Sequence, residues 1–354
     1  MNNTTDYILR RLRLRHLELL VVLTREPTLR GAAVLLHLSQ PAISKMLHEI
    51  ETCFGARLFE RSRQGVHANA LGVAASQRAR IVLNELQRAT DDIAALRAGA
   101  SAVLRVGAPS VTATVPAAIV RLRSRLPGTA VQIREGQVRE LIQRLLNGEL
   151  DCVFGAITPE LLAGDMLPRL KSEVLLEDEL CVLASTCNPL TRRRRMGWAS
   201  LQDAPWVAPP KETLVRQAFM TAFLNEGVQP PEPVIEAMSS VTVGAVLRLD
   251  ASLLCAVRLE HARDEVARGD VRRVRVEPTM ALPSFGLFTR RDATSQPALL
   301  QEFAHEIRQG GTAAGKSRCR YALSVVLVSQ KNQPHRVTWG AHLCTDFSLS
   351  VVLS

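Results

Sequence analysis

The stretch from Ala32 to Arg61 reads AAVLLHLSQPAISKMLHEIETCFGARLFER. Thr28, shortly before it, is a residue type that caps helix N-termini, and the apolar spacing that follows predicts a short helix. Only a two-residue turn separates this helix from Ser39, which can cap a further helix with Pro41 in its first turn. This spacing predicts a helix-turn-helix over residues 29–48, a motif that places its second helix in the major groove of DNA.

The second of these helices has one apolar and one polar face. Ile43, Leu47 and Ile50 recur at helical spacing and should face the core. Leu58 and Phe59 can anchor a following hairpin, or wing, whose arginines would face the phosphate backbone. The residues that we expect to contact DNA are Thr28, Ser39, Gln40, Pro41, Ser44, Lys45, His48, Arg61 and Arg63. The alternative is a small helical bundle whose polar face is only solvated.

Charge is distributed unevenly along the chain. The net charge is +10; residues 1–70 carry ten Lys and Arg against six Asp and Glu, and residues 312–354 carry five against one. Residues 101–311 are close to neutral, with 25 against 24, and their basic run Arg192 to Arg195 is expected to be a solvated loop. A basic head that binds a polyanion, joined to a neutral body, fits this distribution.

The head resembles a known family. The N-terminal signature of LysR-type transcriptional regulators is similar, at fixed spacing, to Ala32-Ala33, Leu36, Ser39-Gln40-Pro41-Ala42, Ser44, Leu47, Ile50-Glu51, Phe54-Gly55, Leu58-Phe59 and Arg61. The resemblance covers roughly residues 12 to 310. It implies a bacterial regulator that binds an interrupted palindromic operator on double-stranded DNA as a homo-oligomer, a dimer of dimers. Where the family usually has Leu-Thr-x-x-Gly, this chain has Ala68-Asn69-Ala70-Leu71-Gly72.

A proline-free stretch from Gly72 to Arg97 follows the head. Its apolar residues alternate steps of four and three, which is typical of the seam of a two-stranded coiled coil. The seam residues are Ala75, Ala79, Val82, Leu86, Ala89, Ile93 and Leu96. We therefore expect residues 70–98 to form a dimerising linker helix. The alternative is a single helix packed on its own domain, because alanine makes a thin interface.

Strand and helix patterns alternate beyond a hinge of small residues at Ala98 to Ala102. Strands over 103–107, 131–133 and 150–155 with helices between them imply parallel β-α-β units, and the pattern resumes between residues 180 and 257. This half is similar to the effector-binding part of the same family. The expected fold is α+β and multidomain, with an all-α winged helix-turn-helix over 12–69, a long linker helix over 70–98 and a periplasmic-binding-protein-like α/β domain of two subdomains over 103–310.

A small ligand is expected at the loops that follow strands, where free backbone N–H groups and helix dipoles meet. The candidate effector-binding residues in such loops are Ser110, Thr112, Gln137, Pro209, Ser239 and Ser240. For Ser110 and Thr112 the alternative is a simple helix cap without a ligand. The resemblance implies that the effector is a small carboxylate, an aromatic acid or a sugar derivative.

Other functional classes find less support in the sequence. Seven scattered cysteines without a C-x-x-C pair favour reduced, mostly buried thiols over disulfides or a zinc site. Catalytic and nucleotide-binding motifs are missing, so we expect no enzyme, no cofactor and no metal. No signal or long apolar segment is visible, which favours a cytoplasmic protein without membrane contact. The competing hypothesis is an α/β solute-binding or enzymatic protein with an incidental helical head.

The last residues, 311–354, continue past the expected fold. They hold two of the seven cysteines and two apolar runs, at Ala322 to Val328 and Leu349 to Leu353. We interpret them as a disordered or misread extension. The alternative is an added strand or a segment that binds a partner.

Overall fold

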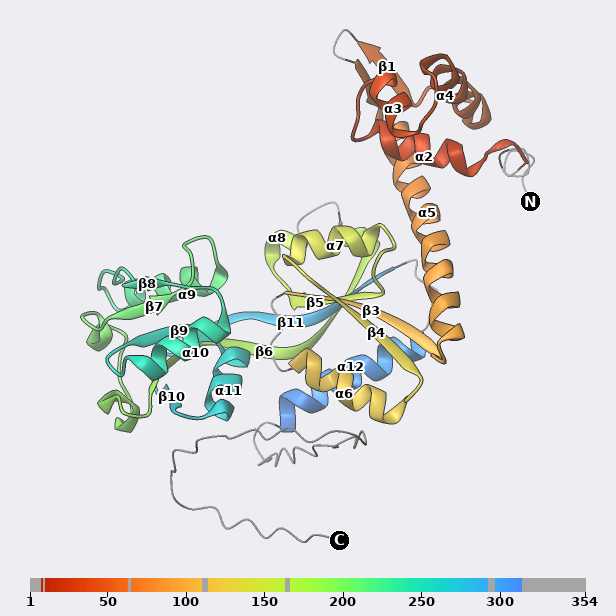
Figure 1. Cartoon of the computed structure of the whole chain (residues 1–354). Helices are drawn as coiled ribbons and strands as arrows, with labels where there is room; N and C mark the ends of the chain where they lie inside the picture. The colour runs from red at the N-terminus through yellow and green to blue at the C-terminus, as the bar shows by residue number, and fades with distance from the viewer. Residues whose placement is uncertain are drawn as a thin grey trace, which may run out of the picture. The chain divides into compact units, whose positions relative to one another are not determined.

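A computed structural model describes residues 8–313 except 9, 63–64, 110–113, 163–165 and 292–296. In chain order it contains a helical head, one long helix and an α/β domain (Figure 1). The predicted fold class is therefore confirmed. Among the described residues, no helix is long and apolar enough to cross a membrane. The predicted extension at residues 311–354 lies outside the described residues from residue 314 on.

The head consists of three helices and a β-hairpin. Its elements are α2 (Leu14–Leu23), α3 (Leu29–Leu35), α4 (Gln40–Phe54), β1 (Phe59–Ser62) and β2 (Gly65–Ala68). The predicted core residues Ile43, Leu47 and Ile50 are buried, and Leu58 and Phe59 at the base of the hairpin join the same hydrophobic cluster. The Glu51 carboxylate accepts hydrogen bonds from the backbone N–H groups of Leu58 (2.8 Å) and Phe59 (3.1 Å), which fixes the wing to α4.

The long helix α5 (Ala70–Arg97) begins at an asparagine cap. The Asn69 Oδ1 atom accepts a hydrogen bond from the Gly72 N–H at 2.9 Å, and its Nδ2 atom donates to the Arg57 carbonyl at 2.9 Å. Asparagine thus replaces the threonine usual at this point with an equally good cap. Residue 72 must be glycine, because a Cβ atom there would lie 2.0 Å from the Leu58 carbonyl oxygen.

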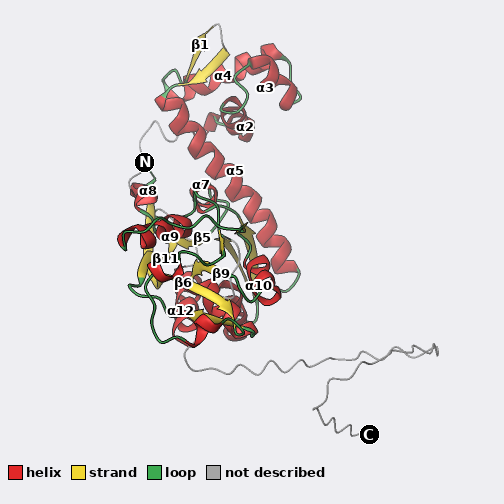
Figure 2. Ribbon diagram, turned by 90° about the vertical axis from the view of Figure 1, so that its left-hand side faces the viewer, coloured by secondary structure: helices red, strands yellow, loops and turns green. Residues whose placement is uncertain are grey.

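The predicted seam of α5 needs a correction at its start. Ala75 and Ala79 pack into the core of the head, so they are not available to a second helix. The later seam residues are exposed along one unbroken helix (Figure 2): Val82 by 45%, Leu86 by 46%, Ile93 by 53% and Leu96 by 54%. The first turns of α5 therefore pack on their own domain, as the alternative prediction had it. The rest of α5 carries an apolar stripe that no described part of the chain covers.

Two long antiparallel strands, β6 (Leu170–Ser185) and β11 (Met280–Arg290), run through both halves of the α/β domain (Figure 1). The first subdomain has the strand order β4-β3-β5-β11-β6, and the second has β6-β9-β7-β8 with β10 also paired to β6. β3 pairs in parallel with β4 and β5, as β7 does with β8 and β9, which agrees with the predicted β-α-β units. The shorter strands are β3 (Ala102–Ala108), β4 (Thr129–Glu135), β5 (Cys152–Ala156), β7 (Trp206–Ala208), β8 (Ile235–Glu236), β9 (Leu254–Arg258) and β10 (Val271–Val274).

Helices cover both faces of this sheet. In the first subdomain α6 and α12 pack on one face and α7 on the other (Figure 1). In the second subdomain Trp206, Phe219 and Phe223 pack edge to face with ring centroids 4.8 to 5.9 Å apart. The helices are α6 (Thr114–Arg125), α7 (Val138–Leu146), α8 (Pro159–Leu162), α9 (Leu214–Asn225), α10 (Ser240–Leu249), α11 (Leu259–Arg268) and α12 (Pro297–Ala313).

A buried ion pair joins α5 to the first subdomain. Arg88, whose side chain is 11% exposed, pairs with Asp151 and donates a hydrogen bond to the Gly148 carbonyl at 3.1 Å. The other carboxylate oxygen of Asp151 accepts from the backbone N–H of Arg105 at the start of the sheet, at 2.8 Å. Asp151 therefore ties the end of the linker helix to β3.

Candidate functional site

The recognition helix α4 presents an exposed polar stripe. Gln40, Lys45 and His48 are exposed, and Ser44 is half-buried. Residues 40, 44 and 48 are spaced by one helical turn, so their side chains lie on one face, away from the buried apolar residues. The predicted cap is confirmed, because the Ser39 Oγ atom accepts from the Ala42 N–H at 3.3 Å and Pro41 lies in the first turn.

The wing lies beside this stripe. Arg61 on β1 is exposed, and its Nη2 atom donates to the Ser44 Oγ atom at 3.4 Å. The next predicted contact, Arg63, is outside the described residues. Thr28 caps α3 as predicted: its Oγ atom accepts from the Gly31 N–H at 2.9 Å and donates to Glu26 at 2.6 Å. The hydroxyl of Thr28 is thus already engaged within the head.

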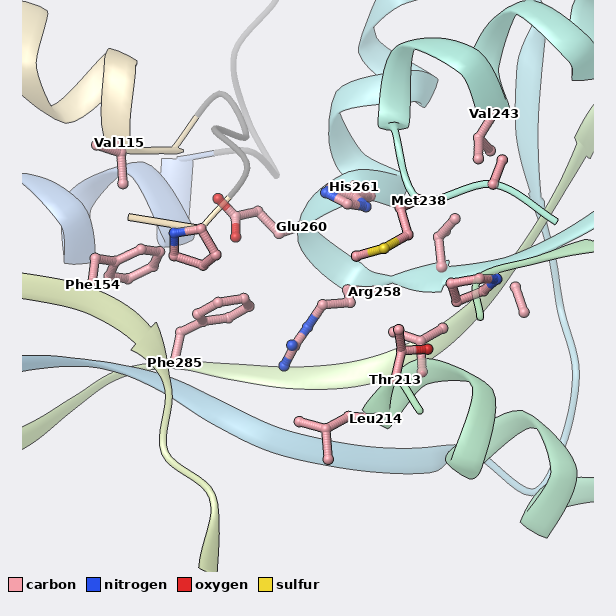
Figure 3. A pocket seen from close by; sticks show the side chains of 16 residues that line it. Val115, Phe154, Thr213, Leu214, Met238, Val243, Arg258, Glu260, His261 and Phe285 are labelled. Carbon is pink, nitrogen blue, oxygen red and sulfur yellow. The ribbon is translucent and has the colours of Figure 1, made fainter. Parts of the chain in front are cut away.

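A cavity of about 240 Å³ lies between the two subdomains (Figure 3). Val115, Phe154 and Phe285 contribute apolar walls from the first subdomain and β11. The rings of Phe154 and Phe285 stack at 5.0 Å. Leu214, Met238 and Val243 line the side of the second subdomain, and the polar lining residues are Thr213, Arg258, Glu260 and His261. An apolar cavity with a few convergent polar groups is the usual form of a small-molecule site.

The guanidinium of Arg258 stands over the Phe285 ring at 4.2 Å. Its Nε atom donates to Asp178 Oδ2 at 2.6 Å, and its Nη2 atom donates to the Pro283 carbonyl at 3.0 Å. Burial raises the pKa of Asp178, and the charge of Arg258 opposes that rise. The pair therefore places a compensated cation at the floor of the cavity.

Glu260 is the second residue of α11 in the second subdomain and is 7% exposed. Burial raises its pKa to about 7, against a hydrogen bond from the Thr114 side chain that lowers it. Thr114 begins α6 in the first subdomain, so this contact bridges the cleft. Burial, helped by the charge of Arg258, lowers the pKa of His261, so its imidazole is neutral at physiological pH.

The predicted effector residues fall in different places. Pro209 lines the cavity, whereas Gln137 is exposed before α7 and is not among the lining residues. Ser239 and Ser240 start α10 next to the lining residue Met238, and Ser239 caps that helix through the Thr242 N–H at 3.5 Å. Ser110 and Thr112 lie outside the described residues.

Sequence reasoning missed the polar groups that do line the cavity. Arg258, Glu260 and His261 come directly at the end of β9. The rule that pointed to Ser110, that polar residues after a strand face the cleft, would have identified them. Within the described ranges no group of three or more His, Cys, Asp or Glu side chains is placed to hold a metal. The five cysteines in these ranges are free, and four of them are buried.

Comparison with known sequences assigns both parts of the chain. Residues 97–311 match the LysR substrate binding domain, and residues 14–73 match the bacterial regulatory helix-turn-helix protein, lysR family. The chain belongs to the LysR family. It is a DNA-binding transcriptional regulator whose α/β part is an effector-binding domain. The resemblance inferred from the recognition-helix residues is thus confirmed.

Individual relatives agree with this assignment. The HTH-type transcriptional regulator GbpR of Azospirillum brasilense is 31% identical over 291 residues, which span 81% of this chain and 83% of the relative. A full-length OxyR structure from Pseudomonas aeruginosa is similar with a TM-score of 0.54 at 22% identity, over 84% of this chain and 95% of that chain. Full-length CbnR complexed with its target DNA gives a TM-score of 0.52 at 19% identity, over 84% and 100%. The structural likenesses show that the fold is shared.

Proposed function

We propose that this LysR regulator binds an interrupted palindromic operator in the bacterial cytoplasm with α4 in the major groove. The observation that carries the proposal is the polar stripe of exposed Gln40, half-buried Ser44 and exposed His48, with Arg61 of the wing hydrogen-bonded to Ser44. An amide, a hydroxyl and an imidazole can pair with base edges, and guanidinium groups neutralise phosphates. A polar face that was merely solvated would not require a cationic wing beside it.

Each predicted DNA contact has a role in this proposal. Gln40, Ser44, Lys45 and His48 read the groove, while Arg61 and Arg63 bind backbone phosphates beside it. Ser39, Pro41 and Thr28 act mainly by setting the start of helices, because their groups cap or initiate α4 and α3. The specificity of binding should therefore depend on residues 40, 44 and 48, and its salt dependence on the arginines.

We propose that the regulator is a homo-oligomer in which two α5 helices pair through Val82, Leu86, Ile93 and Leu96. These side chains are exposed by 45 to 54%. Pairing with a second helix would remove their apolar surface from water, which favours the pair. A two-fold pair of heads matches a palindrome and places its recognition helices about one DNA turn apart. A dimer of dimers would then occupy a longer, interrupted site.

The effector site in this proposal is the cavity between the subdomains, and its role is binding rather than catalysis. Phe154 and Phe285 accept an apolar or aromatic body, while Arg258 and Glu260 meet its polar end. Because the pKa of Glu260 is about 7, its protonated form can donate to a small carboxylate, and its ionised form can accept from the hydroxyls of a sugar derivative. Ser110, Thr112, Pro209, Ser239, Ser240 and, more distantly, Gln137 complete the proposed loops around the ligand.

Ligand binding would act on DNA through the two subdomains. The contact between Glu260 and Thr114 spans the cleft, so a ligand that enters beside it favours a different relative position of the subdomains. β6 and β11 transmit that change, since both strands belong to both subdomains. The expected output is an altered arrangement of the paired heads and hence of the bound DNA.

A DNA titration tests the proposed function. Full-length protein is mixed with labelled DNA from the region upstream of its own gene and competed with random DNA over a series of salt concentrations. We expect a complex that survives the random competitor and weakens with salt. If unlabelled random DNA displaces the labelled fragment as readily as the unlabelled fragment itself does, the result would contradict sequence-specific regulation.

A further inference from the structure

A second cavity lies where the linker helix α5 meets the first subdomain. Its volume is about 240 Å³, and it shares no lining residue with the cleft between the subdomains. All its lining residues except one leucine are polar or charged: Asn84, Gln87, Arg88, Asp91, Arg105, Gln132, Arg134, Arg144, Glu149 and Leu150. This cavity is termed the linker pocket. Its polar lining sets it apart from the mainly apolar cleft.

One face of α5 forms one wall of the linker pocket. Its lining residues, spaced by three or four positions and therefore on one side of the helix, are Asn84, Gln87, Arg88 and Asp91. Asn84 and Arg88 donate hydrogen bonds to backbone carbonyls of the loop between α7 and β5, at 2.7 and 3.1 Å. Asp91 makes no contact of this kind within the described chain. Its Oδ1 atom accepts from Gln87 Nε2 of the same helix, at 3.0 Å.

The strands β3 and β4 supply the arginines of the other wall. β4 is the edge strand of the sheet, and its register with β3 places Gln132 beside Arg105 and Arg134 beside Gly107. Residues two positions apart along a strand share a face, so Arg105 and Arg134 project from the same face. A strand spacing of about 4.8 Å and a rise of about 3.3 Å per residue place their Cα atoms about 8 Å apart. Both arginine side chains can therefore reach one anionic group between them.

The guanidinium of Arg105 has a buried nitrogen without a partner. Its side chain is 4% exposed, and its Nη2 atom donates to Asp92 Oδ1 at 2.6 Å. Its Nη1 atom is also buried and makes no hydrogen bond within the described part of the chain. A buried charged donor without an acceptor is unfavourable, and native proteins contain few of them. Water or an oxygen atom of a ligand in the linker pocket can supply the missing acceptor.

Two opposite charges line the linker pocket without forming an ion pair. Arg134 on β4 is exposed and has no ion-pair partner among the described residues, and the same holds for Asp91 on α5. The other charged lining residues are paired within the protein, as Arg144 is with Glu149 at 3.6 Å. The linker pocket therefore presents one unpaired cation and one unpaired carboxylate.

These two charges select the class of ligand that fits. A simple anion would be attracted by Arg105 and Arg134 but repelled by Asp91, and a simple cation would meet the reverse. A small molecule that carries both charges, a few ångströms apart, can satisfy both walls of the linker pocket. A free α-amino acid has this arrangement, with a carboxylate and an ammonium group on one carbon atom.

We propose that the linker pocket binds a free α-amino acid. The ligand carboxylate accepts hydrogen bonds from Arg105 Nη1 and from Arg134, and the ligand ammonium group donates to Asp91. The bound ligand joins α5 to β3 and β4, and so supplements the ion pair between Arg88 and Asp151 that already holds the linker helix. This site is independent of the proposed operator contacts and of the effector site in the cleft.

Equilibrium dialysis of the full-length protein tests the ligand class. The probes are the common amino acids, each radiolabelled and dialysed separately at neutral pH and up to millimolar concentration. The amino acid that binds most tightly is then compared with its two single-charge analogues, which for alanine are propionate and ethylamine. We expect at least one amino acid to bind, and each analogue to bind at least about tenfold more weakly, because each loses one charge-assisted contact.

Two variants assign the binding to the linker pocket. Arg134→Gln and Asp91→Asn each remove one charge, and each should weaken amino-acid binding about tenfold to a hundredfold. The matched controls are Arg139→Gln and Asp203→Asn, which remove the same charges at exposed positions outside the lining and should bind like the wild type. Thermal unfolding followed by circular dichroism checks that all these proteins fold, and Arg134→Gln replaces an exposed side chain that the fold does not require.

Several results would overturn the proposal. Binding of no amino acid would mean that water alone fills the linker pocket. An analogue with one charge that binds as tightly as the amino acid would contradict recognition of both charges. Wild-type affinity in Arg134→Gln or Asp91→Asn, or an equal loss in the controls, would place the ligand elsewhere in the protein. The DNA titration has no bearing on these outcomes, so operator recognition and amino-acid binding can fail separately.

Discussion

Glu260→Gln should remove a pH-dependent loss of stability from the effector-binding domain. Burial raises the pKa of Glu260 from 4.5 to about 7, so the folded protein holds this proton more tightly than the unfolded chain does. The contribution of the Glu260 proton to the free energy of unfolding is fully present below pH 4.5 and is lost as the pH rises to about 7. At about 1.4 kcal/mol per pKa unit, the difference between the pKa of 4.5 in the unfolded chain and about 7 in the folded protein corresponds to about 3 kcal/mol. Glutamine cannot ionise and should not show this loss.

Urea unfolding of the full-length protein at pH 5 and pH 8 measures the effect. Trp198 and Trp206 are buried in the same subdomain as Glu260, so their fluorescence reports its unfolding. Other titrating groups are common to both proteins and cancel in the difference between them. The free energy of unfolding of Glu260→Gln, relative to wild type, should rise by about 2 to 3 kcal/mol between pH 5 and pH 8.

A constant difference between the two proteins would refute this reasoning. It would mean that Glu260 is ionised throughout and that its contact with Thr114 compensates for burial. Glu236→Gln is the matched control, because Glu236 is an exposed carboxylate of the same subdomain. This control should follow the wild type at both pH values.

Three further changes probe other contacts. Leu86→Lys should halve the mass measured by light scattering, because it places a charge in the exposed apolar stripe of α5. The control Val234→Lys replaces a side chain that is 63% exposed outside α5 and should leave the mass unchanged. An unaltered mass of Leu86→Lys would rule out pairing through α5. Asn69→Ala should lower the free energy of unfolding of the head by about 1 kcal/mol, since it removes the cap of α5, and a head as stable as wild type by thermal unfolding would show that the cap is dispensable. Arg258→Ala should cost about 3 to 5 kcal/mol in urea unfolding because it leaves Asp178 buried without its partner; adding Asp178→Asn should recover most of that cost, and no recovery would mean that packing against Phe285 dominates.

The head could be predicted in detail because its signals are local. Ser39 and Pro41 mark the start of α4 within three residues, and helical spacing identifies the buried side of Ile43, Leu47 and Ile50. The same spacing misassigned Ala75 and Ala79, whose periodicity does not distinguish the core of the head from a seam between two chains. Periodicity gives the face of a helix and not the identity of what covers it.

The cleft was predicted less well because it is assembled from distant segments. Phe154 and Phe285 stack across β5 and β11, and Glu260 meets Thr114 from the other subdomain. The long strand β6 does not alternate regularly, since most of its first half is exposed or half-buried while its second half is buried except at Glu179. No short window of sequence contains either juxtaposition. The rule of strand ends led to Pro209, which lines the cavity, but not to the charged lining residues Arg258 and Glu260.

The specificity ratio of Gln40→Ala tests most directly whether α4 reads bases. Its affinity for the upstream fragment and for random DNA is measured at one salt concentration and compared with the wild type. The account predicts that specific binding weakens by about 1 to 3 kcal/mol while binding to random DNA is nearly unchanged. An equal loss on both DNAs would contradict base recognition by the exposed stripe of α4.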